Sequence, residues 1–211
     1  MVKCALTLAL ILILGLTSPT YSFAFWEKDI TLEDESIYNY LQVKETESSV
    51  ILSTNVLFGV QSILMKDARL TGMYYDYALA APLMAGITKD RPGDILILGL
   101  GTGTFAKYCC EYFPGSSIEG VEIDEKIANL AAEYFELPDS VQVSVYDGRS
   151  YLAASHKTYD VIMVDAYQDI TIPFQMSSRE FFTEVAKHLN PEGVMVVNMN
   201  MKSGSKDSIN D

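Results

Sequence analysis

Basic side chains are scarce in this sequence. Fifteen lysines and arginines stand against 28 aspartates and glutamates, which gives a formal net charge of −13. Proteins that bind nucleic acid need clustered lysine and arginine to contact phosphates. The imbalance therefore argues against nucleic acid as a partner.

Histidine and cysteine are also rare, with two and three residues. His156 and His188 stand alone and far apart, so we expect surface or capping positions and no metal site. Cys109 and Cys110 are adjacent on a predicted helix, where their side chains diverge, which disfavours an ordinary disulfide. We expect both to pack in the core.

The apolar run near the N-terminus is too short to span a bilayer comfortably. Within residues 1–24, Lys3 precedes an apolar stretch from Ala5 to Leu16, and Ser22-Phe23-Ala24 offers small residues for cleavage. This pattern predicts a signal peptide that is removed before Phe25, and hence a periplasmic or extracellular protein. An uncleaved membrane anchor is the alternative.

No internal repeat or low-complexity linker divides the rest of the chain, so we expect one main domain with a small β-region before it. The β-region is predicted at residues 25–72, the main domain at 73–201 and a polar tail at 202–211. A short acidic lead opens the β-region, and its strands are predicted at Val50–Ser53, Asn55–Leu64 and Ala68–Leu70.

A glycine-rich turn lies between an apolar strand and a predicted helix. Ile95–Leu98 leads into Gly99, Gly101 and Gly103, and the helix is predicted from Thr104 to Phe113. Glycine is needed where the chain turns tightly and lets a ligand approach the main chain. The pattern is typical of a nucleotide-binding turn in a parallel α/β sheet.

Three more strand-length runs follow, and each ends beside a carboxylate. Predicted helices separate them, so the strands should be parallel. The sequence therefore predicts an α/β fold with a doubly wound, mainly parallel Rossmann-like sheet, whose carboxyl edge gathers these side chains into one ligand crevice. The runs are Ser117–Val121 before Glu122, Val141–Val145 before Asp147 and Gly148, and Tyr159–Val164 before Asp165; helices are predicted at 125–135, 148–154 and 178–189, and a last strand at Val194–Met199.

The spacing of these residues favours an adenosyl sulfonium ligand. A dinucleotide fingerprint requires a third glycine where Thr104 stands, so NAD is disfavoured. Glu122 follows Gly103 by nineteen positions, and a carboxylate at that distance can accept both ribose hydroxyls. Asp147 can accept the adenine amino group. The ligand that fits best is therefore adenosine attached to a sulfonium, as in S-adenosylmethionine.

From about Val43 to Asn198 the sequence resembles the spermidine synthase (polyamine aminopropyltransferase) family, whose catalytic domain is a variant of the methyltransferase fold. Each supporting string is short, and together they are moderately specific. They are Gly72-Met73-Tyr74-Tyr75-Asp76-Tyr77, the glycine loop, Val121-Glu122-Ile123-Asp124, Asp147-Gly148, Tyr159–Asp165, Ile172-Pro173-Phe174 and Arg179-Glu180-Phe181-Phe182.

The resemblance implies transfer of an aminopropyl group from decarboxylated S-adenosylmethionine to a polyamine such as putrescine. Asp165 corresponds to the catalytic aspartate that assists deprotonation of the amine, and Tyr74 to a tyrosine near that substrate. Carboxylates at the crevice favour such a cationic amine. The expected co-substrate-binding residues are Gly99, Gly101, Thr102, Gly103, Glu122 for the ribose, Ile123, Asp147 for the adenine, and Gly148, with no metal.

The sequence departs from the family at several positions. Thr102 stands where active members have an aspartate for the aminopropyl ammonium, and Tyr75 replaces a glutamine or histidine. Gln168 replaces a second carboxylate, and Asp169 lies one place later. These departures weaken spermidine synthesis more than adenosyl binding. A methyltransferase and a degenerate, non-catalytic adenosyl-binding protein stay open as alternatives.

The predicted sheet has two strands and a helix fewer than a full methyltransferase-type sheet. We therefore expect a C-terminally truncated sheet with an apolar edge. A second copy in a homodimer, or another subunit, is expected to cover that edge.

Overall fold

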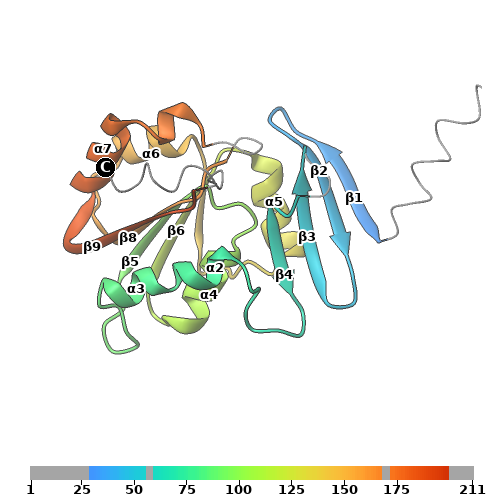
Figure 1. The fold of residues 1–211 in the computed structure, drawn as a ribbon, viewed down its shortest axis with the longest axis horizontal. Helices are drawn as coiled ribbons and strands as arrows, with labels where there is room; N and C mark the ends of the chain where they lie inside the picture. The colour runs from blue at the N-terminus through green and yellow to red at the C-terminus, as the bar shows by residue number, and fades with distance from the viewer. Residues whose placement is uncertain (1–28, 56–58, 168–171, 200–211) are drawn as a thin grey trace, which may run out of the picture.

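A computed structural model describes residues 29–55, 59–167 and 172–199. The predicted leader at residues 1–24, the polar tail at 202–211, and the positions Gln168 and Asp169 lie outside the described residues. An antiparallel sheet and a parallel sheet with helices on both faces stand side by side (Figure 1).

The N-terminal sheet contains four antiparallel strands in chain order. Sequence reasoning predicted only the third of them well. The run Asn55–Leu64 is not one strand, because Asn55 has a positive φ of 41° and pairing resumes only at Ser62. Ala68–Leu70 forms no strand. The strands are β1 (Ile30–Glu35), β2 (Tyr40–Glu45), β3 (Ser49–Thr54) and β4 (Ser62–Met65).

The parallel sheet has the order β7-β6-β5-β8-β9. Every neighbouring pair in it is parallel. This arrangement confirms the predicted α/β fold class. Its strands are β5 (Asp94–Leu98), β6 (Ser117–Glu122), β7 (Gln142–Val145), β8 (Tyr159–Val164) and β9 (Leu189–Val197).

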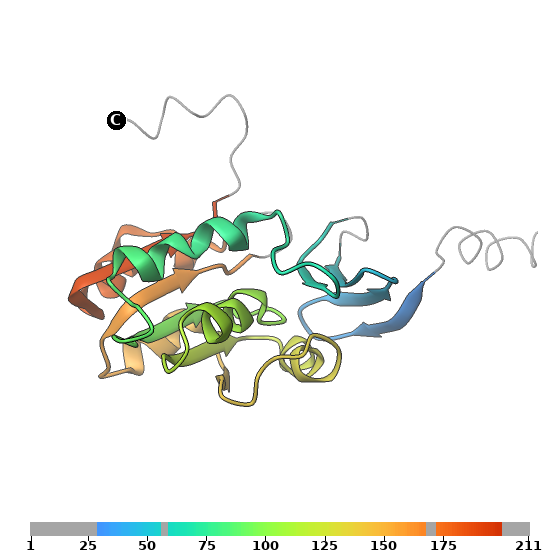
Figure 2. The same ribbon diagram turned by 90° about the horizontal axis from the view of Figure 1, so that it is seen from below.

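Helices cover both faces of the parallel sheet, with one group on each side of its strands in Figure 1, and Figure 2 looks onto one of these groups. Successive side chains of a strand point to opposite faces, so Ile95 and Ile97 join one core cluster while Leu96 and Leu98 join the other. The first cluster is covered by α2 (Tyr74–Ala78), α3 (Ala80–Met84) and α4 (Thr104–Tyr112), and the second by α6 (Gly148–Ala154), the 3₁₀ helix η1 (Phe174–Met176) and α7 (Arg179–Lys187).

Helix α5 (Glu125–Tyr134) joins the two sheets. Its buried residues Ile127 and Leu130 form a third core cluster with Leu41 and Leu52 of the N-terminal sheet. Because α5 begins just after β6, this packing holds the N-terminal sheet beside the carboxyl edge of the parallel sheet (Figure 1).

The rare residues take structural positions. Cys109 is buried and Cys110 half-buried, and both are free thiols. His188 ends α7, where its ring contacts the Glu184 and Ser155 carbonyl oxygens. Within 29–55, 59–167 and 172–199, no three His, Cys, Asp or Glu side chains are grouped to hold a metal ion. No helix of those segments has the length and apolar character that crossing a bilayer requires.

Candidate functional site

A cavity of about 310 Å³ lies at the carboxyl edge of the parallel sheet. The N-terminal sheet closes one side of it, and the loops after β5, β6, β7 and β8, with residues of α2 and η1, form the rest. Ligands of open α/β sheets bind in this place. The lining includes Ile37, Tyr38, Asn39, Gln61, Ser62, Tyr75, Gly99, Gly101, Glu122, Ile123, Tyr146, Asp147, Gly148, Asp165 and Tyr167.

The three glycines of the loop after β5 all have positive φ: 88° at Gly99, 56° at Gly101 and 83° at Gly103. Residues that carry a Cβ rarely adopt this backbone conformation. A Cβ at Gly99 would also lie 2.4 Å from the Asp165 carbonyl oxygen. The loop therefore runs against the start of the Asp165 segment in a way that only glycine permits.

Two of the predicted binding residues, Thr102 and Gly103, are placed outside the lining of the cavity. Thr102 is 1% exposed, and its amide donates to the Ser62 hydroxyl at 3.3 Å. A Cβ at Gly103 would meet Leu137 at 2.3 Å. These two residues fix the loop against β4 and the segment after α5, and no direct ligand contact follows from their positions.

Glu122 lies at the end of β6 and is 7% exposed. One oxygen accepts the Gly101 amide at 2.8 Å and the other accepts the Asp124 amide at 3.0 Å. Burial raises the pKa of this carboxyl, and the amide hydrogen bonds act against that rise. Because each carboxylate oxygen can accept a second hydrogen bond, Glu122 can still accept ligand hydroxyls.

Asp147 and Gly148 line the cavity after β7, the strand that pairs with β6. The Asp147 side chain caps α6 by accepting the Ser150 amide on Oδ1 at 2.8 Å. This bond fixes the orientation of the carboxylate, as is usual for an N-cap aspartate. Ile123 also lines the cavity and is 41% exposed.

Asp165 follows β8 and receives two side-chain hydrogen bonds. The Tyr74 hydroxyl donates to Oδ2 at 2.5 Å, and the Asn198 amide donates to Oδ1 at 2.9 Å. Burial raises the pKa of Asp165 to about 6, although both hydrogen bonds act to lower it. The group is therefore mostly ionised at neutral pH and able to take up a proton.

Tyr74 acts as a donor in this arrangement. Burial and the nearby Asp165 charge raise its pKa far above the usual range, so the hydroxyl keeps its proton. Its ring lies 3.9 Å from that of Tyr75, whose hydroxyl donates to the Gln61 carbonyl oxygen at 2.9 Å. The two tyrosines thus tie α2 to the Asp165 carboxylate and to the segment before β4.

Sequence reasoning missed three contributors to the site. Asn198 stands directly after the last strand, where its position at a carboxyl edge was an available signal. Gln61 lies outside any predicted motif. The turn between β1 and β2 brings Ile37 and Tyr38 to the cavity, and it was missed because neither strand was predicted.

Comparisons with known proteins agree with this geometry. The chain is 60% identical over 210 residues to a "Probable polyamine aminopropyl transferase" of Bifidobacterium longum, covering 100% of this chain and 46% of that protein. This chain thus spans about half of that relative's length. The crystal structure of a probable spermidine synthase from Corynebacterium glutamicum shares the fold, with a TM-score of 0.73 and 24% identity over 86% of this chain and 68% of that one.

A methyltransferase structure is also similar. Human methyltransferase-like protein 13, solved in complex with SAH, superposes with a TM-score of 0.56 and 30% identity over 64% of this chain and 69% of that one. A family model described as the spermine/spermidine synthase domain matches residues 77–210. That segment begins in α2 and includes the whole parallel sheet with its carboxylates. The chain belongs to the spermine/spermidine synthase family.

Proposed function

We propose that this protein transfers an aminopropyl group from decarboxylated S-adenosylmethionine to a polyamine such as putrescine. The observation that carries the proposal is the Asp165 carboxylate, which two donors hold at a cavity that Glu122 and Asp147 also line. Membership of the family and the similarity to the Bifidobacterium longum protein support it.

The residues of the cavity fit an adenosyl sulfonium. The buried Glu122 would accept the ribose hydroxyls and Asp147 the adenine amino group, while Gly99 and Gly101 let the ligand lie close to the main chain. No lysine, arginine or histidine is among the described residues that line this cavity. Its carboxylates therefore favour cationic ligands over anionic ones.

The transfer requires a neutral amine as nucleophile. The amine lone pair attacks the methylene carbon beside the sulfonium, a nitrogen–carbon bond forms, and the carbon–sulfur bond breaks with its electron pair going to sulfur. Methylthioadenosine leaves as a neutral thioether. Asp165 would bind the ammonium form of the acceptor and then receive its proton, which is general base assistance.

A methyltransferase that uses S-adenosylmethionine is the second candidate. The similarity to the human methyltransferase solved with SAH supports it. The threonine at position 102 supports it as well, because that side chain offers no carboxylate for an aminopropyl ammonium. Its hydroxyl is buried and has no hydrogen-bond partner among the residues that the structure describes.

Calorimetric titration of the protein with three ligands separates these candidates. Methylthioadenosine, S-adenosylmethionine and decarboxylated S-adenosylmethionine are titrated side by side, and the products with putrescine are identified by mass spectrometry. We expect the decarboxylated form to bind more tightly than S-adenosylmethionine and to yield methylthioadenosine with spermidine. A preference for S-adenosylmethionine would favour the methyltransferase, and no binding of any ligand would contradict both functions.

A further inference from the structure

We propose that Asn198 is a positioning residue, which holds the Asp165 carboxylate in the orientation that meets the attacking amine. The proposal rests on the proposed function, since it concerns the same carboxylate. Asn198 stands one residue beyond β9 and is half-buried, like Asp165.

Each oxygen of Asp165 receives one side-chain donor. Tyr74 from α2 takes Oδ2 and Asn198 takes Oδ1 at 2.9 Å. With two donors on two oxygens, rotation of the carboxylate about its last bond would break both hydrogen bonds. Such orientation matters for rate, because a small misplacement of a catalytic group costs much of the advantage of a bound geometry.

Asn198 is itself fixed through its main chain. Its amide donates to the Val164 carbonyl oxygen at 3.1 Å, which continues the pairing of β9 with β8. Its carbonyl oxygen accepts the Tyr167 hydroxyl at 3.0 Å. With both main-chain groups held, the side chain has little freedom to leave Asp165.

The groups around Asp165 come from several elements. Tyr74 and Tyr75 of α2 face it, and Tyr167 follows it in the chain. Glu122 at the end of β6 and Asp147 before α6 share its cavity, and no described cation lines that cavity. No cationic side chain among these residues therefore competes with Tyr74 and Asn198 for the Asp165 oxygens. The hydrogen bond from the Asn198 side-chain amide lowers the pKa of Asp165.

The same two strands supply a matched control at their opposite end. The side-chain amide of Asn190 in β9 donates to Asp160 Oδ1 in β8 at 2.9 Å. The main-chain amide of Asp94 donates to the other oxygen of Asp160, also at 2.9 Å. All of Asn190, Asp160, Asn198 and Asp165 are half-buried. Asn190 and Asp160 do not line the cavity.

The test compares Asn198→Ala, Asn198→Asp and Asn190→Ala in the full chain. Rates of aminopropyl transfer are measured against pH, with separate kcat and KM values, and the Asp165 carboxyl is titrated by carbon-13 NMR. In Asn198→Ala we expect two midpoints to shift to higher pH by about one unit or more: that of the acid side of the pH–rate profile and that of the NMR titration of Asp165. The shift is expected because one charge-assisted hydrogen bond to the carboxylate is lost.

Asn198→Asp should move both midpoints further upward, since two adjacent carboxyls share one proton. In both Asn198 variants we expect kcat to fall by about tenfold or more, with KM for the adenosyl co-substrate unchanged. Asn190→Ala should leave the acid side of the pH–rate profile, the NMR titration of Asp165 and kcat as in the wild type. Unchanged titration and kcat in Asn198→Ala would overturn the proposal.

The NMR titration keeps this inference separate from the proposed function. If the wild type transfers no aminopropyl group, the proposed function fails while the titration still measures what Asn198 does to Asp165. A shift of the Asp165 titration in Asn198→Ala supports the proposal that Asn198 holds this carboxylate, and an unshifted titration contradicts the proposal.

Discussion

At the scale of single residues, Glu122 performs two tasks. It ties the glycine loop to the start of α5 through the Gly101 and Asp124 amides, and it faces the cavity. Burying a carboxylate is unfavourable unless its oxygens are hydrogen-bonded, so the amides make the buried position possible.

We predict that Glu122→Gln weakens methylthioadenosine binding by about 1.5–3 kcal/mol, the usual range for hydrogen bonds to a charged group. This corresponds to roughly 10- to 150-fold in the dissociation constant. Calorimetry measures the change, and Glu125→Gln, an exposed glutamate at the start of α5, is the matched control. Equal methylthioadenosine affinity in the two variants would show that Glu122 does not bind the ligand.

The carboxyl ends of parallel strands lie at one edge of the sheet. From this rule the sequence predicted that Glu122, Asp147 and Asp165 lie close together. Sequence spacing could not tell which loop residues face inward. Thr102 follows Gly101 in the chain, yet the positive φ values of the loop turn it into the protein, against Ser62. That contact depends on β4, a distant part of the chain.

At the scale of elements, the turn between β1 and β2 forms one wall of the site. The Ser36 hydroxyl donates to Asp124 at 2.5 Å and accepts the Asn39 amide at 2.9 Å. Asp124 also caps α5. Ser36 therefore fixes a turn whose residues Ile37 and Tyr38 line the cavity.

We predict that Ser36→Ala loosens this wall. Loss of the hydroxyl should cost about 1 kcal/mol of unfolding free energy and about fivefold in methylthioadenosine affinity, measured by denaturant unfolding and calorimetry. Ser48→Ala is the control, because Ser48 is an exposed serine in the turn between β2 and β3. Equal ligand affinity in both variants would show that the turn does not shape the site.

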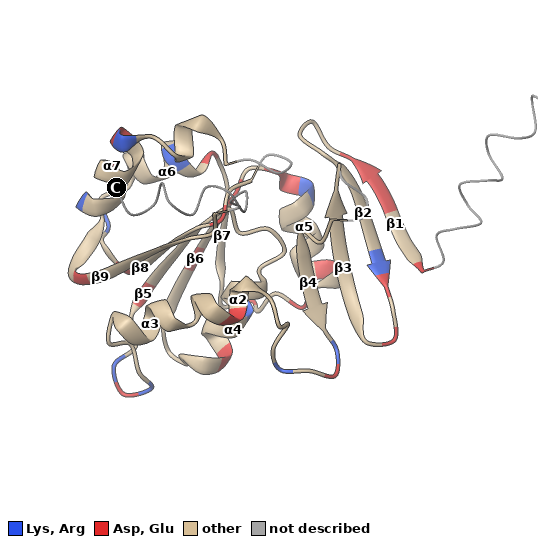
Figure 3. Cartoon of the chain, viewed as in Figure 1, with Lys and Arg blue, Asp and Glu red and all other residues tan. Residues whose placement is uncertain are grey.

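The strand β1 was not predicted from the sequence for a physical reason. Residues Glu33–Glu35 of β1 are acidic and lie at an exposed edge, which Figure 3 shows in red. Charged edge strands avoid pairing with other chains, but their composition resembles a solvated lead. The strands β5, β6 and β8 were predictable because they are buried between the helical layers and read largely as apolar runs.

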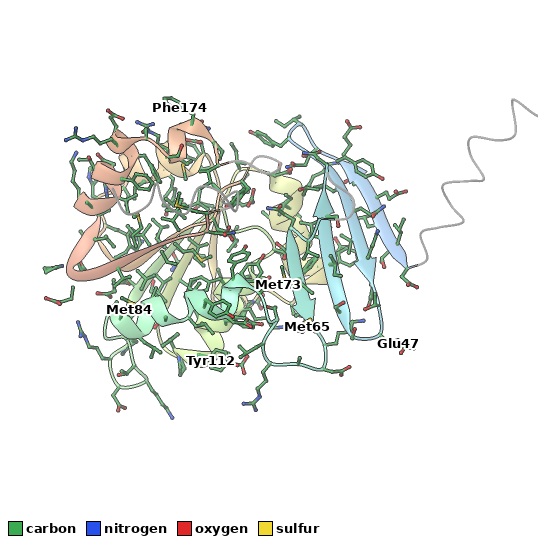
Figure 4. The ribbon with its side chains drawn as sticks, in the orientation of Figure 1. Glu47, Met65, Met73, Met84, Tyr112 and Phe174 are labelled. Carbon is green, nitrogen blue, oxygen red and sulfur yellow. The ribbon has the colours of Figure 1, made fainter. Side chains whose placement is uncertain are left out.

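At the scale of the whole molecule, apolar side chains remain exposed on the helices that cover the two faces of the parallel sheet. Figure 4 labels Met84 on α3 and Phe174 on η1, which are 73% and 82% exposed. The β9 edge has no neighbouring strand among the described residues. Covering of that edge by a second subunit stays a prediction, as do the signal peptide and export.

The central claim is that Asp165 serves as the general base of a transfer reaction at an adenosyl site. The most direct test is a single-turnover measurement of aminopropyl transfer by the wild type and by Asp165→Asn, with Asp139→Asn as an exposed control. General base assistance contributes about 10²–10⁴-fold. We predict a loss of that order in Asp165→Asn with methylthioadenosine affinity retained, whereas an unchanged transfer rate in this variant would contradict the account.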